Sequence, residues 1–322
     1  MRLLTRIVPA VAMAMALGQA TAQDLPPSPI RLLVGFAPGG GNDVVARLVA
    51  TQFQINTKET MVVENKPGGG STVAAAEMAR AKPTGQTLLM GSVGGQAIAP
   101  SIYSKLPYDP IKGVQPVSLV AKSANALVVN AELPEKNVKE LLAYAKAHPG
   151  TLNVTSPGNG TISHLSAELF KSMAGVFITH IPYRGDAPAM QDVMGGQAQM
   201  TFASLPSAKA GADTGKVRIL AVTSAKRVDS MPQVPTIAES GVPGYDVVSW
   251  YGIFTTGGTP MPVVNRLAKE IGAVLAQPNV RESITKMGME AGALGPVEFT
   301  ELVNADTRKW EKVVKTVGIK LD

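Results

Sequence analysis

The sequence predicts an α/β protein built from two domains. Its 322 residues are about twice the ~150 residues that one domain usually holds. Near its start the chain alternates short apolar runs with stretches of helical spacing, a pattern typical of strand–helix units around a parallel sheet. The middle of the chain repeats this alternation. We therefore expect two α/β halves followed by a helical C-terminal part.

The first half shows the alternation clearly. Residues 30–36 form a mostly apolar run between prolines, which predicts a buried strand, and residues 42–53 have apolar positions at helical spacing. The next strand, helix and strand are expected at residues 61–64, 71–80 and 87–90. Short connections between such units favour parallel strands.

The middle and the end of the chain continue this pattern less regularly. Strands are expected at residues 126–130, 152–155, 177–181, 198–202 and 217–222. Helices are expected at residues 138–147 and, after two glycine-containing turns, in segments that end at Met173 and Met194. The order loosens after Pro235, and the last three helices are expected at residues 263–276, 280–287 and 296–317.

Composition excludes several classes of protein. Apolar residues make up 45% and charged residues 17% of the chain, so it can bury a large core and is not expected to be disordered. Because the chain contains no cysteine, disulfides, thiolate metal sites and a cysteine nucleophile are excluded. No apolar run of about 18 residues follows the N-terminal segment, which excludes an integral membrane protein.

Residues 1–22 are interpreted as a signal peptide. Arg2 and Arg6 form a positively charged region before an apolar run at residues 7–18, and Ala-Thr-Ala at residues 20–22 supplies a cleavage signal. The alternative is a buried N-terminal helix. We expect cleavage after this tripeptide and export to the periplasm of a Gram-negative bacterium. The mature chain is only mildly basic and has no dense Lys/Arg cluster, so no nucleic-acid partner is expected.

A glycine-rich turn at residues 36–43, Phe-Ala-Pro-Gly-Gly-Gly-Asn-Asp, follows the first strand. Its glycines expose backbone N–H groups, and the next helix adds the positive end of its dipole, which together predict an anion site. Asn42 or Asp43 could cap the helix, and the acid would favour contact with an anion through water. The alternative is a tight turn with an ordinary cap, and the pattern matches neither a Walker loop nor G-x-G-x-x-G.

A second turn, Ser-Pro-Gly-Asn-Gly-Thr at residues 156–161, also lies between a strand and a helix. Thr161 and Ser163 add hydroxyl groups, and His164 lies in the first helical turn. The interpretation as a second cradle for an anion or polar ligand competes with a simpler one. In that alternative, Thr161 is the N-cap and His164 is a surface residue.

A third turn, Pro-Tyr-Arg-Gly-Asp at residues 182–186, completes the set. Tyr183 offers a flat face and a hydroxyl group, and Arg184 could bind a carboxylate through two parallel hydrogen bonds. Alternatively, Arg184 pairs with Asp186 or lies in solvent. All three turns follow strands, and ligands of open α/β sheets bind at the carboxyl ends of strands.

Catalytic motifs are scarce in this sequence. His148 precedes a proline at a helix end, and His180 lies within an expected strand, where a structural role is favoured. The sequence contains no H-x-x-x-H, no G-x-S-x-G and no acid pair at a metal-binding spacing. No metal site and no cofactor are predicted. A Ser–His–Asp set assembled from distant residues remains open as an alternative.

Several segments, in order along the chain, carry a resemblance to a known family. They read PIRLLVGFAPGGGNDVVARLVA, VVENKPGGGSTVAA, LPYDP, SPGNGTISHLSAELFKSMAG, HIPYRGDAPAMQDVMGGQ, LAVTSAKR and VPTIAESGVPGY. The sequence closely resembles the periplasmic solute-binding proteins of tripartite tricarboxylate transporters, the Bug family. The resemblance covers essentially all of the mature chain.

This resemblance implies a fold and a division into domains. The implied fold is the two-domain periplasmic-binding-protein fold, type II-like with two crossover strands, and the ligand lies in the cleft between the domains. Domain 1 would comprise residues 23–122 and 227–322, and domain 2 residues 123–226. The hinge strands are expected near residues 121–126 and 225–227.

The resemblance also implies a set of ligand-binding residues. The PGGG loop and bridging waters would hold one carboxylate of the ligand. By position, the ligand-binding residues would be Phe36, Pro38, Gly39, Gly40, Gly41, Asn42, Asp43, Ser92, Val93, Ser156, Gly158, Asn159, Gly160, Thr161, His164, Tyr183, Arg184, Gly185 and Ser204.

The sequence departs from the family pattern at three places. Asn42 stands where the family usually has Thr or Ser, and Val-Gly-Gly at residues 93–95 replaces a more polar stretch. Ala203-Ser204 replaces a frequent acidic–amide pair. Since a carboxylate there could hold an ammonium group, an amino-bearing ligand is less expected.

The function implied is that of a receptor, and not that of an enzyme. It would bind a small mono-, di- or tricarboxylate as a monomer and deliver it to the membrane subunits of a tripartite tricarboxylate transporter. Two alternatives remain open: an exported hydrolase on the same fold, and a ligand sensor for a membrane signalling protein.

Overall fold

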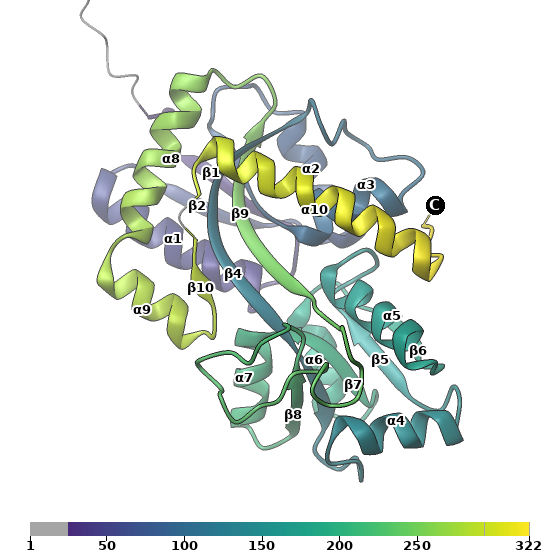
Figure 1. Ribbon diagram of the computed structural model, residues 1–322. Coiled ribbons are helices and arrows are strands. Elements are labelled where there is room, and N and C mark those ends of the chain that lie inside the picture. Colours follow the sequence, from purple (N-terminus) through teal and green to yellow (C-terminus); the bar gives the residue numbers. More distant parts are fainter. Residues whose placement is uncertain (1–24, 293, 322) are drawn as a thin grey trace, which may run out of the picture.

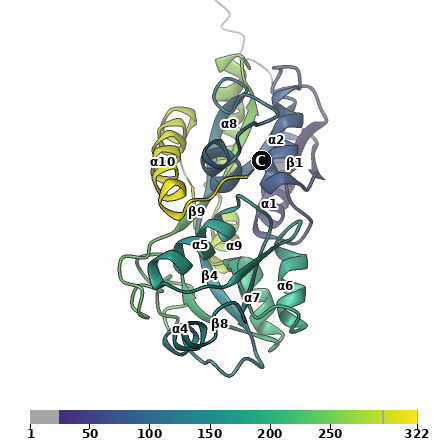
Figure 2. The same ribbon diagram turned by 90° about the vertical axis from the view of Figure 1, so that its right-hand side faces the viewer.

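The computed structural model describes residues 25–292 and 294–321. The predicted signal peptide and its cleavage site lie outside the described residues. The described chain forms two lobes, one above the other, joined by long strands (Figure 1; Figure 2). Each lobe has β-strands covered by helices, so the predicted α/β class is confirmed.

The first lobe contains the N-terminal strands and the C-terminal helices. Its parallel strands are β1 (Ile30–Val34), β2 (Met61–Asn65) and β3 (Thr87–Ser92), and β9 (Val248–Thr256) runs antiparallel beside β3. Its helices are α1 (Gly41–Thr57), α2 (Thr72–Ala79), α3 (Ala99–Ile102), α8 (Met261–Leu275), α9 (Pro278–Lys286) and α10 (Pro296–Val317), with the helical turns η1 (Gly69–Ser71) and η2 (Gly94–Ile98).

The second lobe contains the middle of the chain. Its strands are β5 (Asn153–Ser156), β6 (Thr179–Pro182), β7 (Met200–Ser204) and β8 (Val217–Val222). Strands β6, β5 and β7 are parallel neighbours. Its helices are α4 (Val138–Ala147), α5 (Ile162–Ala174), α6 (Asp186–Met194) and α7 (Leu205–Asp213). Because β1, β3, β5, β6 and β7 all end at the face between the lobes, the turns after them can share one site.

Strand β4 (Val114–Asn130) runs through both lobes and joins them. Its first part lies between β9 and the short strand β10 (Glu290–Ala291), and its last part lies between β7 and β8. The strands therefore follow one path in the order β2-β1-β3-β9-β4-β7-β5-β6. All strands paired with β4 run antiparallel to it. The sheet is therefore mixed, whereas the sequence predicted a parallel sheet.

The chain returns from the second lobe beside β4. The N–H of Thr223 donates to the carbonyl oxygen of Asn125 at 2.9 Å, and the Thr223 hydroxyl accepts from the Asn125 N–H at 2.8 Å. The N–H of Val247 then donates to the carbonyl oxygen of Thr223 at 2.9 Å, just before β9 begins. Two crossing segments side by side confirm the predicted two-crossover fold.

The division into domains stays a prediction, and the contacts suggest one adjustment to it. The N–H of Ile237 donates to the carbonyl oxygen of Val222 at 3.0 Å, and the hydroxyl of Tyr245 donates to the carbonyl oxygen of Ser166 at 2.9 Å. Residues 235–247 thus pack on β8 and α5 of the second lobe. We propose that the second boundary lies after Val247 and not after residue 226.

Sequence patterns missed most of the two crossing strands. Strand β4 was expected only from residue 126, and no strand was expected at residues 248–256. Pro116 lies within β4 and Gly252 lies within β9, and both residue types usually mark strand ends or bulges. The β4–β9 pairing has two register shifts, one of them next to Pro116, which accommodates these residues.

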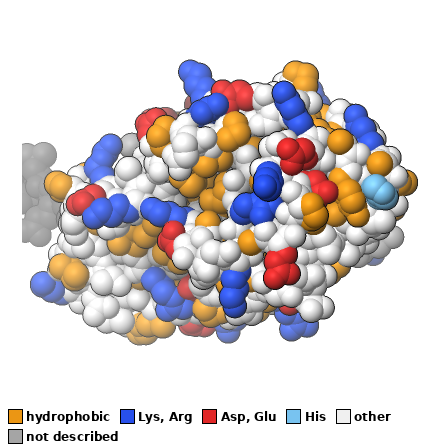
Figure 3. Space-filling model, turned by 90° about the horizontal axis from the view of Figure 1, so that it is seen from below, with side chains coloured by type: hydrophobic (Ala, Val, Ile, Leu, Met, Phe, Trp, Pro, Cys, Tyr) orange, Lys and Arg blue, Asp and Glu red, His pale blue; other side chains and the backbone are white. Residues whose placement is uncertain are grey.

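The surface seen from below carries charges of both signs. Figure 3 shows Lys and Arg side chains interspersed with Asp and Glu over the second lobe on this face. Mixed charges of this kind do not produce the strong single-sign field by which basic surfaces attract nucleic acids.

Helix α10 packs against β9 through a cluster of aromatic side chains. Phe299 lies edge-on to Trp250, with ring centroids 5.4 Å apart, and tilted against Phe254 at 5.1 Å. The indole N–H of Trp250 donates to Oδ2 of Asp306 at 2.6 Å. Phe299 fills the space directly above Gly252, where a Cβ would lie 2.1 Å from the ring. The absence of a side chain at this position therefore allows the helix to approach the strand.

The Gly252→Ala substitution should test this packing. We expect it to lower the free energy of unfolding by about 1–3 kcal/mol, because an extra methyl group in a filled core forces its neighbours to move. The matched control is Gly272→Ala in α8, where nothing lies within 4 Å of the added Cβ. That change should raise stability by about 0.4–1 kcal/mol. Urea unfolding measures both, and equal effects would contradict this account.

Candidate functional site

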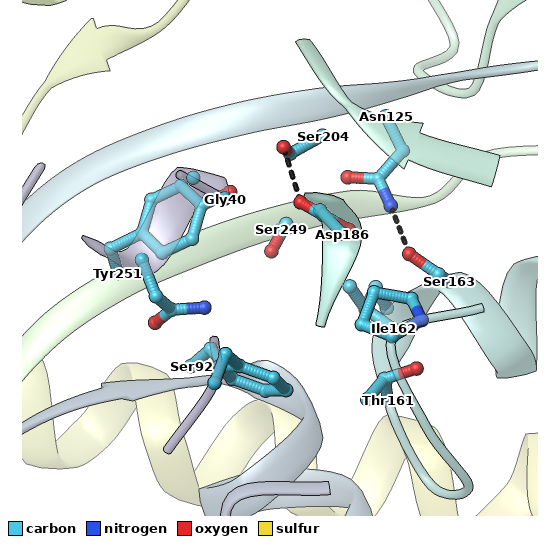
Figure 4. Close-up of a pocket in the computed structure, with 14 residues that line it drawn as sticks. Gly40, Ser92, Asn125, Thr161, Ile162, Ser163, Asp186, Ser204, Ser249 and Tyr251 are labelled. Atoms are coloured by element: carbon cyan, nitrogen blue, oxygen red, sulfur yellow. Dashed lines mark hydrogen bonds between the residues drawn. The ribbon is translucent and has the colours of Figure 1, made fainter. Parts of the chain in front are cut away.

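A small pocket lies where the two lobes meet. Both lobes and both crossing strands contribute to its walls (Figure 4). The residues that line it are Phe36, Gly40, Gly41, Asn42, Ser92, Asn125, Pro157, Thr161, Ile162, Ser163, Asp186, Ser204, Ser249 and Tyr251. Most of them are polar but uncharged, so the pocket suits a ligand that forms hydrogen bonds.

The turn before α1 is held by Asp43 from within the first lobe. Its carboxylate accepts hydrogen bonds from the N–H of Gly39 at 3.0 Å and from the amide of Asn65 at 2.9 Å, and it pairs with Arg47 at 2.9 Å. Burial tends to raise the pKa of Asp43, but the hydrogen bonds from these groups bring it below its ordinary value. Asp43 therefore shapes the turn and does not line the pocket.

The start of α1 consequently lines the pocket through Gly40, Gly41 and Asn42. Gly40 is the N-cap and has no side-chain cap. A Cβ on Gly41 would lie 2.5 Å from the hydroxyl oxygen of Tyr251, so this glycine lets β9 approach the helix start. The side-chain oxygen of Asn42 is buried without a hydrogen-bond partner. The first turn thus presents to the pocket an unpaired acceptor, which suits a hydrogen-bond donor of a ligand.

The second turn combines the two interpretations that the sequence left open. The hydroxyl of Thr161 accepts from the N–H of His164 at 3.3 Å, so Thr161 is the N-cap of α5 and also lines the pocket. Ser163 accepts a hydrogen bond from the side-chain amide of Asn125 at 3.2 Å (Figure 4). The side-chain oxygen of Asn125 has no partner, and the residue is only 2% exposed.

His164 is not a surface residue, which corrects one alternative. Its ring stacks on His180 with centroids 4.0 Å apart, and its Nδ1 accepts from the N–H of Gly160 at 3.1 Å. The Nε2 of His180 lies 2.6 Å from the hydroxyl of Ser156. The two imidazoles therefore support the second turn from behind and lie outside the pocket.

Burial keeps both imidazoles neutral. It is the main cause that lowers the pKa of His164 to about 3 and that of His180 to about 4. The nearby Lys171 lowers both further, and His180 also lowers the pKa of His164. A neutral ring is needed at His164, since a protonated Nδ1 could not accept the Gly160 N–H.

The third turn contributes Asp186 to the pocket and not Arg184. Arg184 is exposed, and its carbonyl oxygen accepts from the N–H of Ala37 at 3.0 Å across the two lobes. The hydroxyl of Tyr183 donates to Asp192 on α6. Asp186 begins α6, lines the pocket and accepts a hydrogen bond from the hydroxyl of Ser204 at 2.6 Å (Figure 4).

The rims of the two lobes touch on one side of the pocket. A Cβ on Gly70 would lie 2.4 Å from the carbonyl oxygen of Asn159, and one on Gly160 would lie 2.4 Å from Ile102. A Cβ on Gly94 would lie 3.0 Å from the Cα of Thr161. The lobes are therefore closed on each other, and glycines allow this close approach of the two backbones.

The structure brings only part of the predicted set into the pocket walls. Those that line it are Phe36, Gly40, Gly41, Asn42, Ser92, Thr161 and Ser204. Those that do not line it are Pro38, Gly39, Asp43, Val93, Ser156, Gly158, Asn159, Gly160, His164, Tyr183, Arg184 and Gly185. Several of the latter support the turns or form the contact between the rims, so the whole set stays a prediction as regards ligand contact.

Sequence reasoning missed half of the wall. Pro157, Ile162, Ser163 and Asp186 lie within or next to turns that the sequence singled out, so a local signal existed for them. Asn125, Ser249 and Tyr251 lie on the crossing strands, and no local pattern distinguishes them. Their place in the wall follows from the pairing of β4 and β9 between the lobes.

No three acidic or histidine side chains in residues 25–292 and 294–321 come together as a metal-binding group would. Within the same part of the chain, none of the helices combines the length and apolar character needed to cross a bilayer.

Comparison with known proteins places this architecture in the class of periplasmic binding proteins. Rpa4515 of R. palustris, solved with adipate, superposes with a TM-score of 0.87 at 36% identity over 90% of this chain and 97% of its own. The periplasmic binding protein BugD gives 0.86 at 35% identity, over 90% and 98%. MatC from Rhodopseudomonas palustris, solved with malate, gives 0.85 at 33%, over 88% and 98%.

The family model described as "Tripartite tricarboxylate transporter family receptor" matches residues 45–319. The chain therefore belongs to the tripartite tricarboxylate transporter receptor family, and the predicted relation to the Bug proteins is confirmed. Since the family and the similar structures are solute-binding proteins, the prediction that this chain is not an enzyme is confirmed as well.

Protonation of the buried histidine pair should destabilise the fold. Because the folded state holds both rings neutral, only the unfolded chain binds protons as the pH falls below about 6.5. The free energy of unfolding should therefore fall between about pH 6.5 and pH 4, by up to about 1.4 kcal/mol per pH unit for each ring. Urea unfolding at several pH values measures this slope.

The variant His180→Gln should reduce that slope, whereas His148→Gln should retain it. His148 is exposed and serves as the matched control. Equal slopes in the wild type and in both variants would show that the pair does not cause the pH dependence.

Proposed function

We propose that the protein is a periplasmic receptor that closes its two lobes around a small organic carboxylate. The observation that carries this proposal is the pocket between the lobes, whose wall includes the starts of α1 and α5. The first N–H groups of a helix have no carbonyl partner within the helix, and the dipole there favours negative charge. Hydroxyl and amide groups on β4 and β9 supply further hydrogen bonds.

The family and its similar structures support the same ligand class. Rpa4515 and MatC were solved with adipate and malate, which are dicarboxylates. The family description names a tripartite tricarboxylate transporter. We propose that this chain is exported by its signal peptide and delivers a carboxylate to membrane subunits of such a transporter. The proposed contact residues are those that line the pocket.

A negative charge added to the pocket should abolish carboxylate binding. The change Asn125→Asp keeps the shape of the side chain and adds a charge next to the start of α5. Calorimetry should be carried out with malate, 2- and 3-hydroxybutyrate, adipate and hexanoate, each compared with its primary amide. We expect the wild type to bind at least one acid and none of the amides, and the variant to lose about tenfold or more in affinity.

The control for this experiment is Asn279→Asp on the exposed surface of α9, which should bind as the wild type does. A ligand at 100 times its Kd should also raise the stability of the wild type by about 2.7 kcal/mol. Binding of an amide as tightly as its acid would contradict the proposal.

Closure of the lobes should be measurable through the contact between the rims. Gly94 does not line the pocket and has no positive φ, so Gly94→Ala adds no backbone strain. Its Cβ would lie 3.0 Å from the Cα of Thr161 and 3.1 Å from the carbonyl oxygen of Gly160, both on the opposite lobe. The variant should disfavour the closed form and weaken binding of the tightest acid about tenfold.

The matched control is Gly95→Ala, whose Cβ would contact Ser71 of the same lobe. Small-angle scattering should show a smaller radius for the wild type and the control with ligand, and a smaller change for Gly94→Ala. Identical affinity and identical contraction in both variants would contradict closure through this rim.

A further inference from the structure

One side chain lies where the ligand's carboxylate was expected. The carboxyl group of Asp186, at the start of α6 in the second lobe, accepts a hydrogen bond from the hydroxyl of Ser204 at 2.6 Å, and the backbone N–H groups of Gly41 and Ser204 lie close enough to favour its charged form. A Cβ on Gly40 would lie only 3.4 Å from its Oδ2. The start of α1, which the sequence assigned to an external anion, thus already holds a carboxyl group of the protein itself.

The polar groups around Asp186 favour its charged form, whereas burial opposes it. Its hydrogen-bond partners are donors, and it lies at the N-terminal ends of both α1 and α6, where helix dipoles stabilise negative charge. The residue as a whole is partly exposed, but enough protein surrounds the carboxyl group for burial to raise its pKa above the ordinary value, and the nearby donors limit that rise.

The rest of the pocket offers no compensating cation. Among the described residues that line it there is no lysine, arginine or histidine. The anion-binding groups that remain are the first N–H groups of α5, beside Thr161 and Ser163. A ligand with two carboxylates would therefore bring its second negative charge towards Asp186 in a confined space, and like charges repel strongly there.

The unpaired side-chain oxygen of Asn125 indicates which group the ligand carries besides its carboxylate. The side-chain oxygen of Asn125 is buried without a partner, and Figure 4 shows it directed into the pocket on the side of Ser204 and Asp186. A buried acceptor without a donor is costly, so a ligand that donates a hydrogen bond at this place would be favoured.

We propose that Asp186 is a specificity-determining residue that takes the place of one ligand carboxylate, so that the pocket selects small monocarboxylic acids carrying a hydrogen-bond donor and rejects dicarboxylates. The carboxylate of the ligand binds at the start of α5, and its hydroxyl or amino group faces Asn125 and Asp186. This inference rests on the proposed function as a carboxylate receptor, and it sets this chain apart from relatives solved with adipate or malate.

Acids that differ only in one carboxylate test this selectivity. The compounds 2- and 3-hydroxybutyrate are malate with one or the other carboxylate replaced by a methyl group, and hexanoate is adipate with one carboxylate replaced by a methyl group. Calorimetry on the mature wild-type protein should show that a hydroxybutyrate binds about tenfold or more tightly than malate. Because this comparison needs no variant, it holds even if a substitution at Asp186 impairs folding.

The substitution Asp186→Asn should then remove the discrimination. Its side chain keeps the size of Asp186 without the charge, so affinity for malate should rise about tenfold while affinity for the hydroxybutyrate changes little. Asp213→Asn removes a charge from the exposed end of α7 in the same lobe and should leave both affinities unchanged.

The outcomes separate this inference from the proposed function. Wild-type binding of malate or adipate as tightly as the matching monocarboxylates would overturn the inference and leave the receptor function standing. The same holds if the ratio of affinities is unchanged in a folded Asp186→Asn variant. If none of the acids binds the wild type, the proposed function itself fails, and the inference fails with it.

Discussion

The pairing of β4 with strands of both lobes is the interaction on which the rest of this structure depends. Strand β4 lies between β9 and β10 at one end and between β7 and β8 at the other, so its hydrogen bonds hold both sheets in register with each other. Asn125 lies where β4 changes neighbours and where Thr223 begins the return. Asn125 is therefore fixed to both lobes, and the part of the pocket wall that it forms is the least movable part of the site.

The remaining walls come from helix starts that each lobe stabilises separately. Asp43 folds the first turn from inside the first lobe, and the stacked imidazoles of His164 and His180 support the second turn from inside the other. These supporting groups fix the shape of both turns from outside the pocket. Binding energy can then go into closing the lobes and need not order the loops, which is the advantage of a preorganised site.

Close approach of the lobes depends on backbone contact. Gly70, Gly94 and Gly160 have no side chains at the rims, and the Ala37 N–H donates to the carbonyl oxygen of Arg184 between the lobes. Asp186 adds a polar link, because it begins α6 in one lobe and its carboxyl group lies against Gly40 and Gly41 of the other. The closed form is therefore held by contacts of the protein itself, and their strength sets the free energy that a ligand would have to supply to keep the lobes closed.

Local patterns in the sequence determined the strand–helix units, the glycine-rich turns and the family, because apolar periodicity and turn chemistry are properties of short segments. They located Gly40, Asn42 and Thr161 in the wall for the same reason. Only the tertiary structure decided that β4 and β9 carry Asn125, Ser249 and Tyr251 to the pocket, since strand pairing joins residues far apart in the chain. It likewise decided that Asp186 and not Arg184 faces the start of α1. The orientation of this turn depends on contacts with the opposite lobe, such as the hydrogen bond from the Ala37 N–H to the carbonyl oxygen of Arg184, and a local pattern does not contain them.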